Sequence, residues 1–361
     1  MVDLSLFFEV AHDSSHNNYK KMFDEAVEQA VFADKLGYHA AWFTEHHFLP
    51  GFSESSAPET ILAYLAAKTE NIRLGHGVTL LPFSINHPAR VAERVATLDI
   101  LSGGRVNWGG GRSIALAELG AFGVEAEQSR AEWEEALRVI PKMWTQETFE
   151  WKSDLFEFPA RQVTPKPLQT PHPPVYVAAT QPATCQFAGE NGLGALAFGI
   201  QPSDAGNFVE IYKKAAENPT PITEVTTNRF SAMVVGMCLD DDDEAFATAG
   251  ADFKQYVQYT KELYAPWKDQ APPSYSWYVE NFQKVIEHVE STDIHDLVGQ
   301  GAAAIGNAER CAGVLQTLID GGVDEIILFM ETFTAPHEKV MKSIENFKTK
   351  VEPLLKPRQT A

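Results

Sequence analysis

The sequence predicts an α/β protein, a (β/α)8 barrel formed by one domain that spans residues 1–361. Eight short apolar runs, rich in β-branched and aromatic residues, alternate with longer segments of helical period. This alternation is typical of repeated βαβ units around a parallel sheet. No G-x-G-x-x-G motif follows the first run, so an open dinucleotide-binding sheet is disfavoured. The length suits one barrel with insertions, since such barrels reach about 250 residues or more.

The first half of the chain predicts four strand–helix units. In the first helix, apolar residues recur every three or four positions from Met22 to Leu36, and Gly37 supplies the C-terminal stop. The second helix is expected to have Ser56 as its N-cap and Pro58 in its first turn. The expected strands are residues 4–10, 40–44, 73–81 and 105–110, and the expected helices are residues 19–36, 58–67, 88–101 and 129–145.

The second half of the chain repeats the unit four more times. Two insertions interrupt the pattern, a proline-dotted stretch after the fourth strand and residues 264–300 after the seventh. Because a long loop in a compact domain usually covers or forms a binding site, we expect the segment 264–300 to be a mobile lid. The expected strands are residues 175–179, 194–198, 229–238 and 325–329, and the expected helices are residues 182–190, 203–217, 241–264 and 336–351, with an additional helix at 308–320.

Composition and charge narrow the range of functions. Lys and Arg number 29 and Asp and Glu number 49, so the formal net charge is −20, which disfavours nucleic acid and anionic membranes as partners. The N-terminal residues match neither a signal peptide nor a membrane-spanning helix, so we expect a cytoplasmic protein. Cys185, Cys238 and Cys311 lie far apart and form no C-x-x-C motif, which argues against a disulfide framework or a zinc knuckle.

The residues after the second strand are candidates for proton transfer. In such a barrel the active site lies at the carboxyl ends of the strands, and Glu45, His46 and His47 follow the strand at residues 40–44. Adjacent residues of an extended segment point to opposite sides, so one metal ion cannot easily take both histidines, and we expect no metal site. Imidazole titrates near neutrality and suits acid–base chemistry; the alternative is a pair of structural histidines.

Two further loops at the same end of the barrel favour an anion. The glycines at residues 109–111 allow close approach of a ligand to the backbone, and Arg112 offers a fork of donors that suits phosphate. Thr180, Gln181 and Thr184 lie where the fifth strand turns into a helix, and a helix N-terminus binds anions readily. Each signal alone has a conformational explanation, since glycine turns and N-caps are common. Together they predict one phosphate site between neighbouring strands.

Several ordered blocks of the sequence resemble the bacterial luciferase-like superfamily of flavin-dependent monooxygenases. The similarity is strongest to the luciferase α-subunit branch and covers nearly the whole chain. The blocks that carry it are residues 37–48, which include Trp42-Phe43-Thr44-Glu45-His46-His47-Phe48, and residues 80–82, 87–90, 98–105, 109–112 and 174–179.

The resemblance implies a barrel that binds FMN, supplied as FMNH2 by a separate flavin reductase, and uses O2 as co-substrate. The implied intermediate is a C4a-(hydro)peroxyflavin, which inserts one oxygen atom into a small apolar organic substrate such as an aldehyde or ketone. The reductase partner acts transiently or through free diffusion of FMNH2. Members commonly dimerise through the second and third helices of the barrel, so a homodimer is expected here, although a different chain as partner stays open.

The resemblance also assigns roles to individual residues. His46 corresponds to the histidine that serves as catalytic base near the flavin, and Arg112 to the arginine that contacts its phosphate. Gly77 and Val78 correspond to a pair that often forms a cis peptide beneath the flavin ring. The full set of cofactor-binding candidates is Gly77, Val78, Asn107, Arg112, Ala179, Thr180, Gln181 and Thr184.

Walls of a dry substrate pocket are expected from residues near the strand ends. Phe7, Trp108 and Phe198 supply aromatic rings there, and His47 is the fourth candidate. The alternative for these aromatic residues is that they fill the interior layers of the barrel.

The sequence departs from the luciferase pattern beside the expected flavin site. Gly111 stands where luciferase α-subunits carry a reactive cysteine, and Thr180-Gln181 replace a Glu-Ser pair. We therefore expect FMN chemistry rather than useful light emission. Two alternatives stay open: an F420-dependent oxidoreductase that transfers hydride, and a non-catalytic flavin-binding subunit like the luciferase β-subunit.

Overall fold

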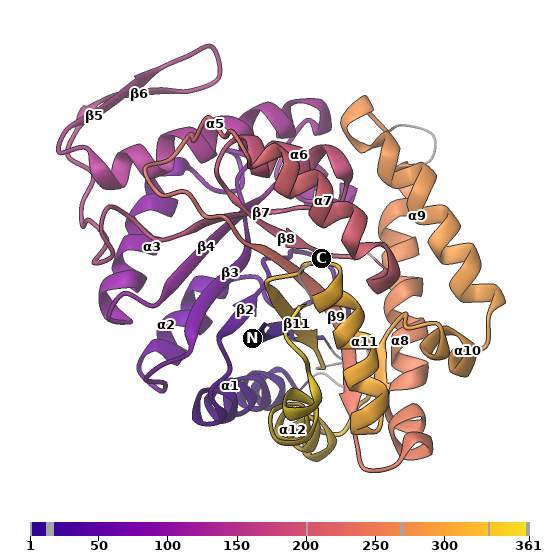
Figure 1. Ribbon diagram of the computed structural model, residues 1–361. Helices are drawn as coiled ribbons and strands as arrows, with labels where there is room; N and C mark the ends of the chain where they lie inside the picture. Colours follow the sequence, from indigo (N-terminus) through magenta and orange to yellow (C-terminus); the bar gives the residue numbers. More distant parts are fainter. Residues whose placement is uncertain (1, 12–17, 200, 268–270, 331–332, 359–361) are drawn as a thin grey trace.

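The structure is a computed structural model that describes residues 2–11, 18–199, 201–267, 271–330 and 333–358. Within these residues, eight parallel strands close into a barrel (Figure 1), which confirms the predicted fold. Strand β11 pairs with β1, and β8 pairs with β9, so the ring is continuous. In ring order the strands are β1 (Asp3–Phe8), β2 (Ala40–Phe43), β3 (Arg73–Leu80), β4 (Val106–Gly111), β7 (Val175–Ala178), β8 (Gly194–Ala197), β9 (Phe230–Cys238) and β11 (Glu325–Phe329).

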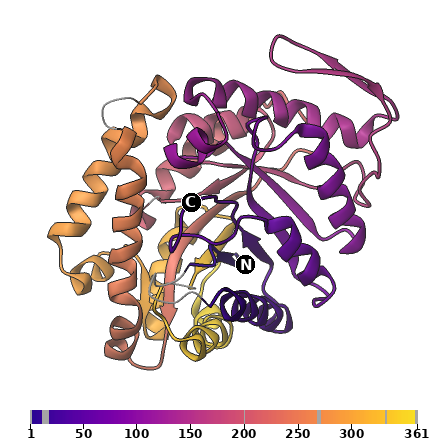
Figure 2. The ribbon, with the colours of Figure 1, turned by 180° about the vertical axis from the view of Figure 1, so that it is seen from behind.

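Helices surround the strands, as the views from both sides show (Figures 1 and 2). Asn18 caps α1 by accepting a hydrogen bond from the backbone N–H of Lys21, and Gly37 ends it with a φ of 78°. The N-cap of α2 is Ala57, without a side-chain hydrogen bond, so the expectation that Ser56 caps this helix is wrong. The outer helices are α1 (Tyr19–Leu36), α2 (Pro58–Ala66), α3 (Pro88–Leu101), α5 (Ala126–Thr145), α6 (Pro182–Glu190), α7 (Ala205–Ala215), α11 (Ala308–Asp320) and α12 (His337–Asn346).

Four short elements were not predicted from the sequence. The proline-dotted stretch forms an antiparallel hairpin of β5 (Phe149–Lys152) and β6 (Glu157–Arg161), which projects from the barrel in Figure 1. A short helix, α4 (Leu116–Ala121), follows β4, and β10 (Ala304–Gly306) adds to the edge of β9. These elements are only three to six residues long, too short for a periodic signal to stand out.

The segment 264–300 is largely helical rather than a loop. It contains α9 (Pro273–Ser291) and α10 (Ile294–Gly299), while residues 268–270 lie outside the described part of the chain. Pro273 occupies the first turn of α9, where its missing N–H costs nothing, so the proline pair at 272–273 marks a helix start and not a break. Together with α8 (Asp242–Tyr264), these helices stand on one side of the barrel, orange in Figure 1. None of the described helices is long and apolar enough to cross a membrane.

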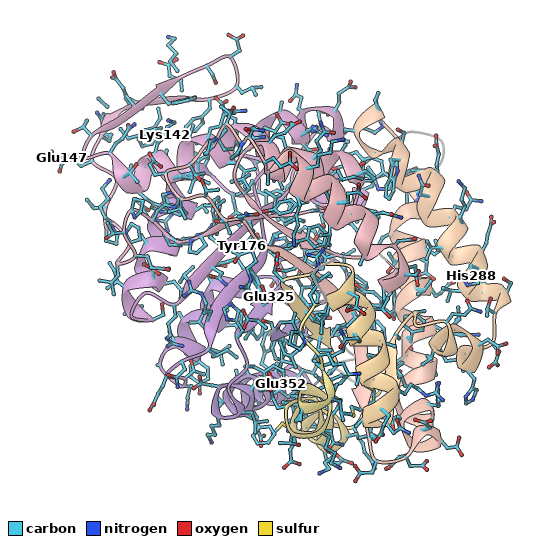
Figure 3. All side chains as sticks on the ribbon, viewed as in Figure 1. Lys142, Glu147, Tyr176, His288, Glu325 and Glu352 are labelled. Carbon is cyan, nitrogen blue, oxygen red and sulfur yellow. The ribbon has the colours of Figure 1, made fainter. Side chains whose placement is uncertain are left out.

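Large side chains fill the amino-terminal half of the barrel. Trp42 packs edge-on against Tyr176, with ring centroids 5.2 Å apart, and its Nε1 donates to Glu325 Oε1 at 2.9 Å. These residues come from β2, β7 and β11, which lie on different sides of the ring, so their contact fills its interior; Figure 3 shows Tyr176 and Glu325 near its centre. These side chains of the described residues therefore fill the barrel at this end.

Candidate active site

A cavity of about 470 Å³ opens at the carboxyl ends of the barrel strands, with α8 and α9 forming one wall. It is the size of a pocket for a small organic molecule or cofactor. The structure brings together at this cavity most of the residues that the sequence singled out. The lining includes Phe7, His46, Gly77, Val78, Arg112, Thr180, Gln181, Thr184 and Phe198.

Trp108 does not line the cavity, contrary to the expectation for the substrate pocket. Successive residues of β4 alternate between the inside and the outside of the barrel. Trp108 points outward, where it packs against Trp144 of α5 with ring centroids 5.2 Å apart, and its Nε1 donates to Thr79 Oγ1 at 3.2 Å. It belongs to the layer between strands and helices.

Three other expected site residues also lie away from the cavity lining. Asn107 faces the amino-terminal half of the barrel, where its Oδ1 accepts a hydrogen bond from Arg73 Nε at 2.7 Å. Ala179 is fully buried, and its backbone N–H donates to the carbonyl of Leu196. His47 turns to the other side of its segment from His46 and packs on Phe122 at 5.0 Å. The strand period explains the opposite directions of His46 and His47.

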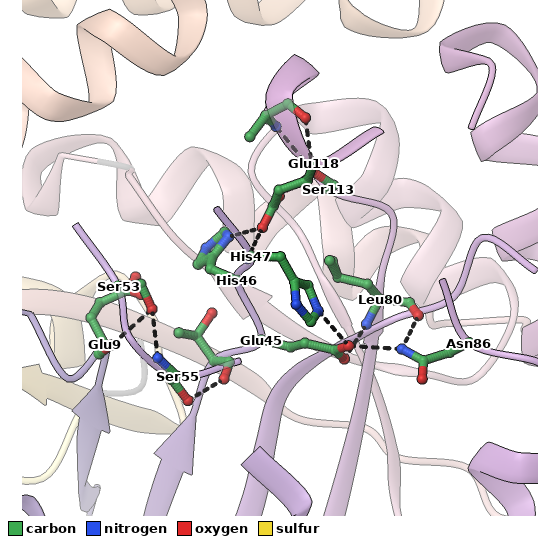
Figure 4. A network of polar contacts seen from close by, with 12 residues as sticks. Glu9, Glu45, His46, His47, Ser53, Ser55, Leu80, Asn86, Ser113 and Glu118 are labelled. Carbon is green, nitrogen blue, oxygen red and sulfur yellow. Dashed lines mark hydrogen bonds and ion pairs between the residues drawn. The ribbon is translucent and has the colours of Figure 1, made fainter. Parts of the chain in front are cut away.

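His46 is bound to a buried carboxylate that the sequence did not reveal (Figure 4). Its Nδ1 lies 3.0 Å from Oε1 of Glu118, a fully buried residue of α4. The same carboxylate accepts hydrogen bonds from the backbone N–H of His47 at 2.6 Å and from the hydroxyl of Ser113. Since Glu118 holds Nδ1, the Nε2 atom of His46 is the one left for a ligand. A single carboxylate within the apolar run 114–122 was the only sequence signal for this residue.

The electrostatics of this pair favour a proton on His46. Burial acts to lower the pKa of His46, but the charge and hydrogen bond of Glu118 outweigh it, and the pKa rises to about 9. Burial acts to raise the pKa of Glu118, and its contact with His46 reverses the direction, so that pKa is lowered. At neutral pH the pair is an imidazolium and a carboxylate, so the imidazole can supply a proton through Nε2.

Glu45 has a structural role at the rim of the cavity. Its Oε2 accepts from the backbone N–H of Leu80 at 2.9 Å, and its Oε1 accepts from Asn86 Nδ2 at 2.8 Å and contacts His47 Nε2 at 3.1 Å. These bonds join the end of β2 to the end of β3. In the part of the chain that the structure describes, no three His, Cys, Asp or Glu side chains gather in a way that could hold a metal ion.

Glu9 is a second buried carboxyl group that the sequence did not identify, and unlike Glu118 it lines the cavity. It follows β1 directly and is 3% exposed. Its Oε2 has no hydrogen-bond partner among the described residues. Burial raises the pKa of Glu9 to about 7, although the nearby His46 acts to lower it.

The cavity lining also carries basic and neutral donor groups. Arg112, Arg130 and Lys284 are among the lining residues, together with the residues around the N-terminus of α6. Arg112 Nη1 donates to Ser274 Oγ at 2.9 Å and Nη2 to the Ser274 carbonyl at 2.7 Å, and its guanidinium lies 4.0 Å over the Tyr275 ring. The arginine therefore joins β4 to α9 at the cavity, and this donor set suits a phosphate-bearing ligand.

Small residues form another part of the cavity wall. The peptide bond between Gly77 and Val78 is cis, as the resemblance predicted. Gly77, Gly111 and Ala178 present almost no side chain to the cavity. A Cβ at Gly111 would lie 2.4 Å from Cγ2 of Val78, so there is no room here for the cysteine of luciferase α-subunits unless Val78 moves. Because these residues carry little or no side chain, a ligand can approach the backbone closely here.

Comparisons with known proteins find relatives over nearly the whole chain. The model of a family described as luciferase-like monooxygenase matches residues 2–325. The oxygenase component of a flavin-dependent trigonelline monooxygenase from Acinetobacter baylyi is 26% identical, over 97% of this chain and 94% of its own length.

Two further matches represent the flavin and F420 branches among these relatives. The oxygenating constituent of 3,6-diketocamphane monooxygenase from Pseudomonas putida, a type II Baeyer–Villiger monooxygenase solved with FMN, has a TM-score of 0.80 and 19% identity, over 100% of both chains. This likeness shows the shared fold. An F420-dependent glucose-6-phosphate dehydrogenase from Amycolatopsis mediterranei is 32% identical, over 47% of this chain and 52% of its own length.

Proposed function

The chain belongs to the luciferase-like monooxygenase family of enzymes, and from this premise we propose that it is the oxygenase component of a two-component, FMNH2-dependent monooxygenase. One atom of O2 enters a small, mainly apolar organic substrate of aldehyde or ketone type, the other leaves as water, and FMNH2 is oxidised to FMN. The observation that carries the proposal is one cavity that joins a set of phosphate-type donors, a wall of small residues and a protonated histidine.

The residues at the cavity fit FMN. Arg112 and the N-terminus of α6, with Thr180, Gln181 and Thr184, would hold the phosphate, because guanidinium and backbone N–H groups favour an anion. The wall at Gly77, Val78 and Gly111 would lie against the flat ring. Bound there as FMNH2, the cofactor supplies the two electrons that reduce O2.

The protein's own part is to hold a proton and exclude water. Glu118 fixes the His46 ring through Nδ1, so Nε2 offers its proton to a group in the cavity from a set direction. Phe7, Phe52 and Phe198 line the cavity with apolar surface, and α8 and α9 form one of its walls. Tyr275 of α9 donates from its hydroxyl to the carbonyl of Ser113 at 2.8 Å, which holds the helix against β4. A dry site protects reactive oxygen species from stray protons.

Two partners belong to this proposal. A flavin reductase supplies FMNH2, by transient contact or by free diffusion. A second copy of the chain binds through α2 and α3, whose Tyr64, Ile100 and Leu101 are exposed apolar side chains. Analytical ultracentrifugation tests the homodimer: Leu101→Lys should shift the protein toward the monomer, and an unchanged mass would contradict this interface.

Stopped-flow absorbance tests the reaction class. The protein is mixed with FMNH2 without oxygen and then with aerated buffer. We expect an absorbing species distinct from both reduced and oxidised FMN, which persists longer than in free flavin and decays faster when aldehydes or ketones are added. In His46→Ala, FMN binding should be retained and oxygenated product lost.

The same experiment separates the alternatives. Appearance of oxidised FMN at the rate of free flavin, together with tight binding of F420, would replace the monooxygenase by a hydride-transferring enzyme. Retained turnover in His46→Ala would remove His46 from the reaction. Binding of FMN with no reaction under any of these conditions would indicate a non-catalytic subunit.

A further inference from the structure

We propose that Glu9 is the counter-ion for a protonated amine on the organic substrate. The substrate then combines an apolar body with one basic nitrogen, which narrows the substrate class of the proposed function. The inference rests on that function in one respect: the cofactor occupies the side of the cavity with Arg112, so the substrate lies toward Glu9 and His46.

The cavity separates its charges by position in the barrel. Glu9 follows β1 and His46 follows β2, whereas Arg112 follows β4 and the α6 N-terminus follows β7. In the ring of eight described strands, β7 lies four places from β1, directly across the barrel. We call the side of Glu9, Glu45 and His46 the acidic end. Its negative charges repel a phosphate group, so the phosphate of the cofactor is not expected at this end.

Glu9 differs in its hydrogen bonding from Glu45 and from Glu118, the carboxylate behind His46. Glu118 has three donors around it, and Glu45 also has three. Glu9 is equally buried, yet its Oε2 has no partner within the described residues. A buried carboxyl oxygen without a donor is costly, and native proteins satisfy nearly all such groups. Because Glu9 lines the cavity, a ligand there can supply the missing donor.

The charges around Glu9 favour a cationic donor over a neutral one. The imidazolium of His46 is already matched by the carboxylate of Glu118 at 3.0 Å. Ionised Glu9 therefore adds a negative charge that no cation of the described residues contacts within salt-bridge distance. A protonated amine restores neutrality and forms a charge-assisted hydrogen bond, the strong kind.

Aromatic rings complete the acidic end. Phe52 stacks on Tyr256 with centroids 5.7 Å apart, and it packs edge-on against His46 at 5.6 Å. Phe7 lines the same cavity and packs on Phe198 at 5.2 Å. Rings beside a carboxylate are the usual surroundings of a bound alkylammonium group, because the ring faces attract cations. The same rings hold the apolar body of the substrate.

Calorimetric titration of the flavin-free protein tests the proposal with two probes of equal size, benzylamine and benzyl alcohol. We expect the wild type to bind the amine more tightly than the alcohol. Glu9→Gln should weaken amine binding by about tenfold or more and leave alcohol binding nearly unchanged, since only the charge is removed. Glu9→Asp, which keeps the charge, should retain part of the preference. Glu127→Gln, an exposed change on α5, is the matched control and should bind like the wild type.

Several results would overturn the proposal. They are equal binding of amine and alcohol by the wild type, an unchanged preference in Glu9→Gln, and no binding of either probe up to the solubility of the alcohol. Circular dichroism and the melting temperature verify that each variant is folded. No flavin or oxygen is present, so failure of the oxygenation test leaves this result standing, and failure here leaves the reaction class untouched.

Discussion

Two buried glutamates, Glu325 at the closed end of the barrel and Glu9 at the open end, show what separates structure from function in this molecule. Glu325 is fully buried, and its carboxylate accepts hydrogen bonds from Ser5, Ser231 and Trp42 and pairs with Arg229 at 3.2 Å. Glu9 is 3% exposed and leaves one carboxyl oxygen without a partner among the described residues. A glutamate side chain thus has all of its hydrogen-bond partners at one end of the barrel and lacks a partner at the other.

This difference indicates a structural role for the closed end of the barrel and a ligand-binding role for the open end. A saturated buried carboxylate fixes its neighbours and has no capacity left for a ligand. An incomplete one beside a cavity carries a cost that a ligand can relieve. Substitutions at the two ends should therefore differ in the sign of their effect on stability.

The largest effect is expected from Glu325→Ala. It leaves the donors of Ser5, Ser231 and Trp42 without their acceptor, and it removes one of the two carboxylates that pair with Arg229, of which Asp3 is the other. We expect the free energy of unfolding to fall by about 3–5 kcal/mol, because several buried donors lose their acceptor at once. Urea denaturation measures this free energy. Glu338→Ala, an exposed change, serves as the control, and its free energy of unfolding should lie within about 0.5 kcal/mol of the wild type. A loss no larger than in the control would mean that this network does not hold the barrel.

Glu9→Gln should have the opposite sign above neutral pH. Burial raises the pKa of Glu9 to about 7 from 4.5, so between these values the folded protein binds more protons than the unfolded chain. Stability of the wild type therefore falls as pH rises through this range. Removing the carboxyl should raise the free energy of unfolding at pH 8 by up to about 3 kcal/mol, less the cost of burying an amide.

Urea denaturation of this variant at pH 5 and pH 8 gives the test. The gain should be seen at pH 8 and nearly vanish at pH 5, where Glu9 is largely protonated in the folded state. Glu127→Gln, exposed on α5, should show no such difference between the two pH values. A destabilised Glu9→Gln at pH 8 would mean that the carboxylate has a partner within the protein.

Glu118→Gln should change the reaction more than the fold. Without the carboxylate, burial still lowers the pKa of His46 and only the charges of Glu9 and Glu45 oppose it, so we expect the imidazole to hold its proton less firmly at neutral pH. We expect turnover at pH 7 to fall about 10–100-fold, the usual range for removing a group that orients a histidine. The pH profile of turnover separates this effect from a loss of folded protein. The fall in turnover expected near pH 9 in the wild type should move to lower pH in the variant. An unmoved fall would assign Glu118 a purely structural role.

The fold was predictable because its signal is periodic. Each barrel strand is a short apolar run, and each outer helix repeats apolar residues every three or four positions, so the strand and helix order follows from residue pattern alone. The helix α9 was missed because Pro272 and Pro273 indicate a break when the partners of the helix are unknown. Packing against α8 and the contacts of Ser274 and Tyr275 with Arg112 stabilise it.

The site was predictable only in part, because it depends on directions that the sequence does not contain. The strand ends pointed to His46, Arg112 and the α6 N-terminus, and the structure brings these to one cavity. Trp108 lies on the same strand as Gly111 yet points outward, because side chains alternate between the two faces of β4. The sequence does not show which residues of the strand face the interior. Glu9 and Glu118 were single acidic residues in apolar runs, and only their burial beside His46 gives them a role.

The smallest expected effect lies in the wall of the cavity, where Gly111 meets Val78. A Cβ at Gly111 would lie 2.4 Å from Val78 Cγ2, so Gly111→Ala forces a shift. Because Val78 borders the open cavity, it can move into that space, and we expect a loss of only about 1 kcal/mol, at the low end for overpacking. In the background of Val78→Ala, which lacks both γ-carbons, the same change should cost almost nothing. The free energies of unfolding of the wild type, the two single variants and the double variant give the coupling energy between the two positions. A coupling energy of zero would mean that Gly111 leaves room for a ligand rather than for Val78. The affinity of Gly111→Ala for FMN would then fall while its stability stayed unchanged.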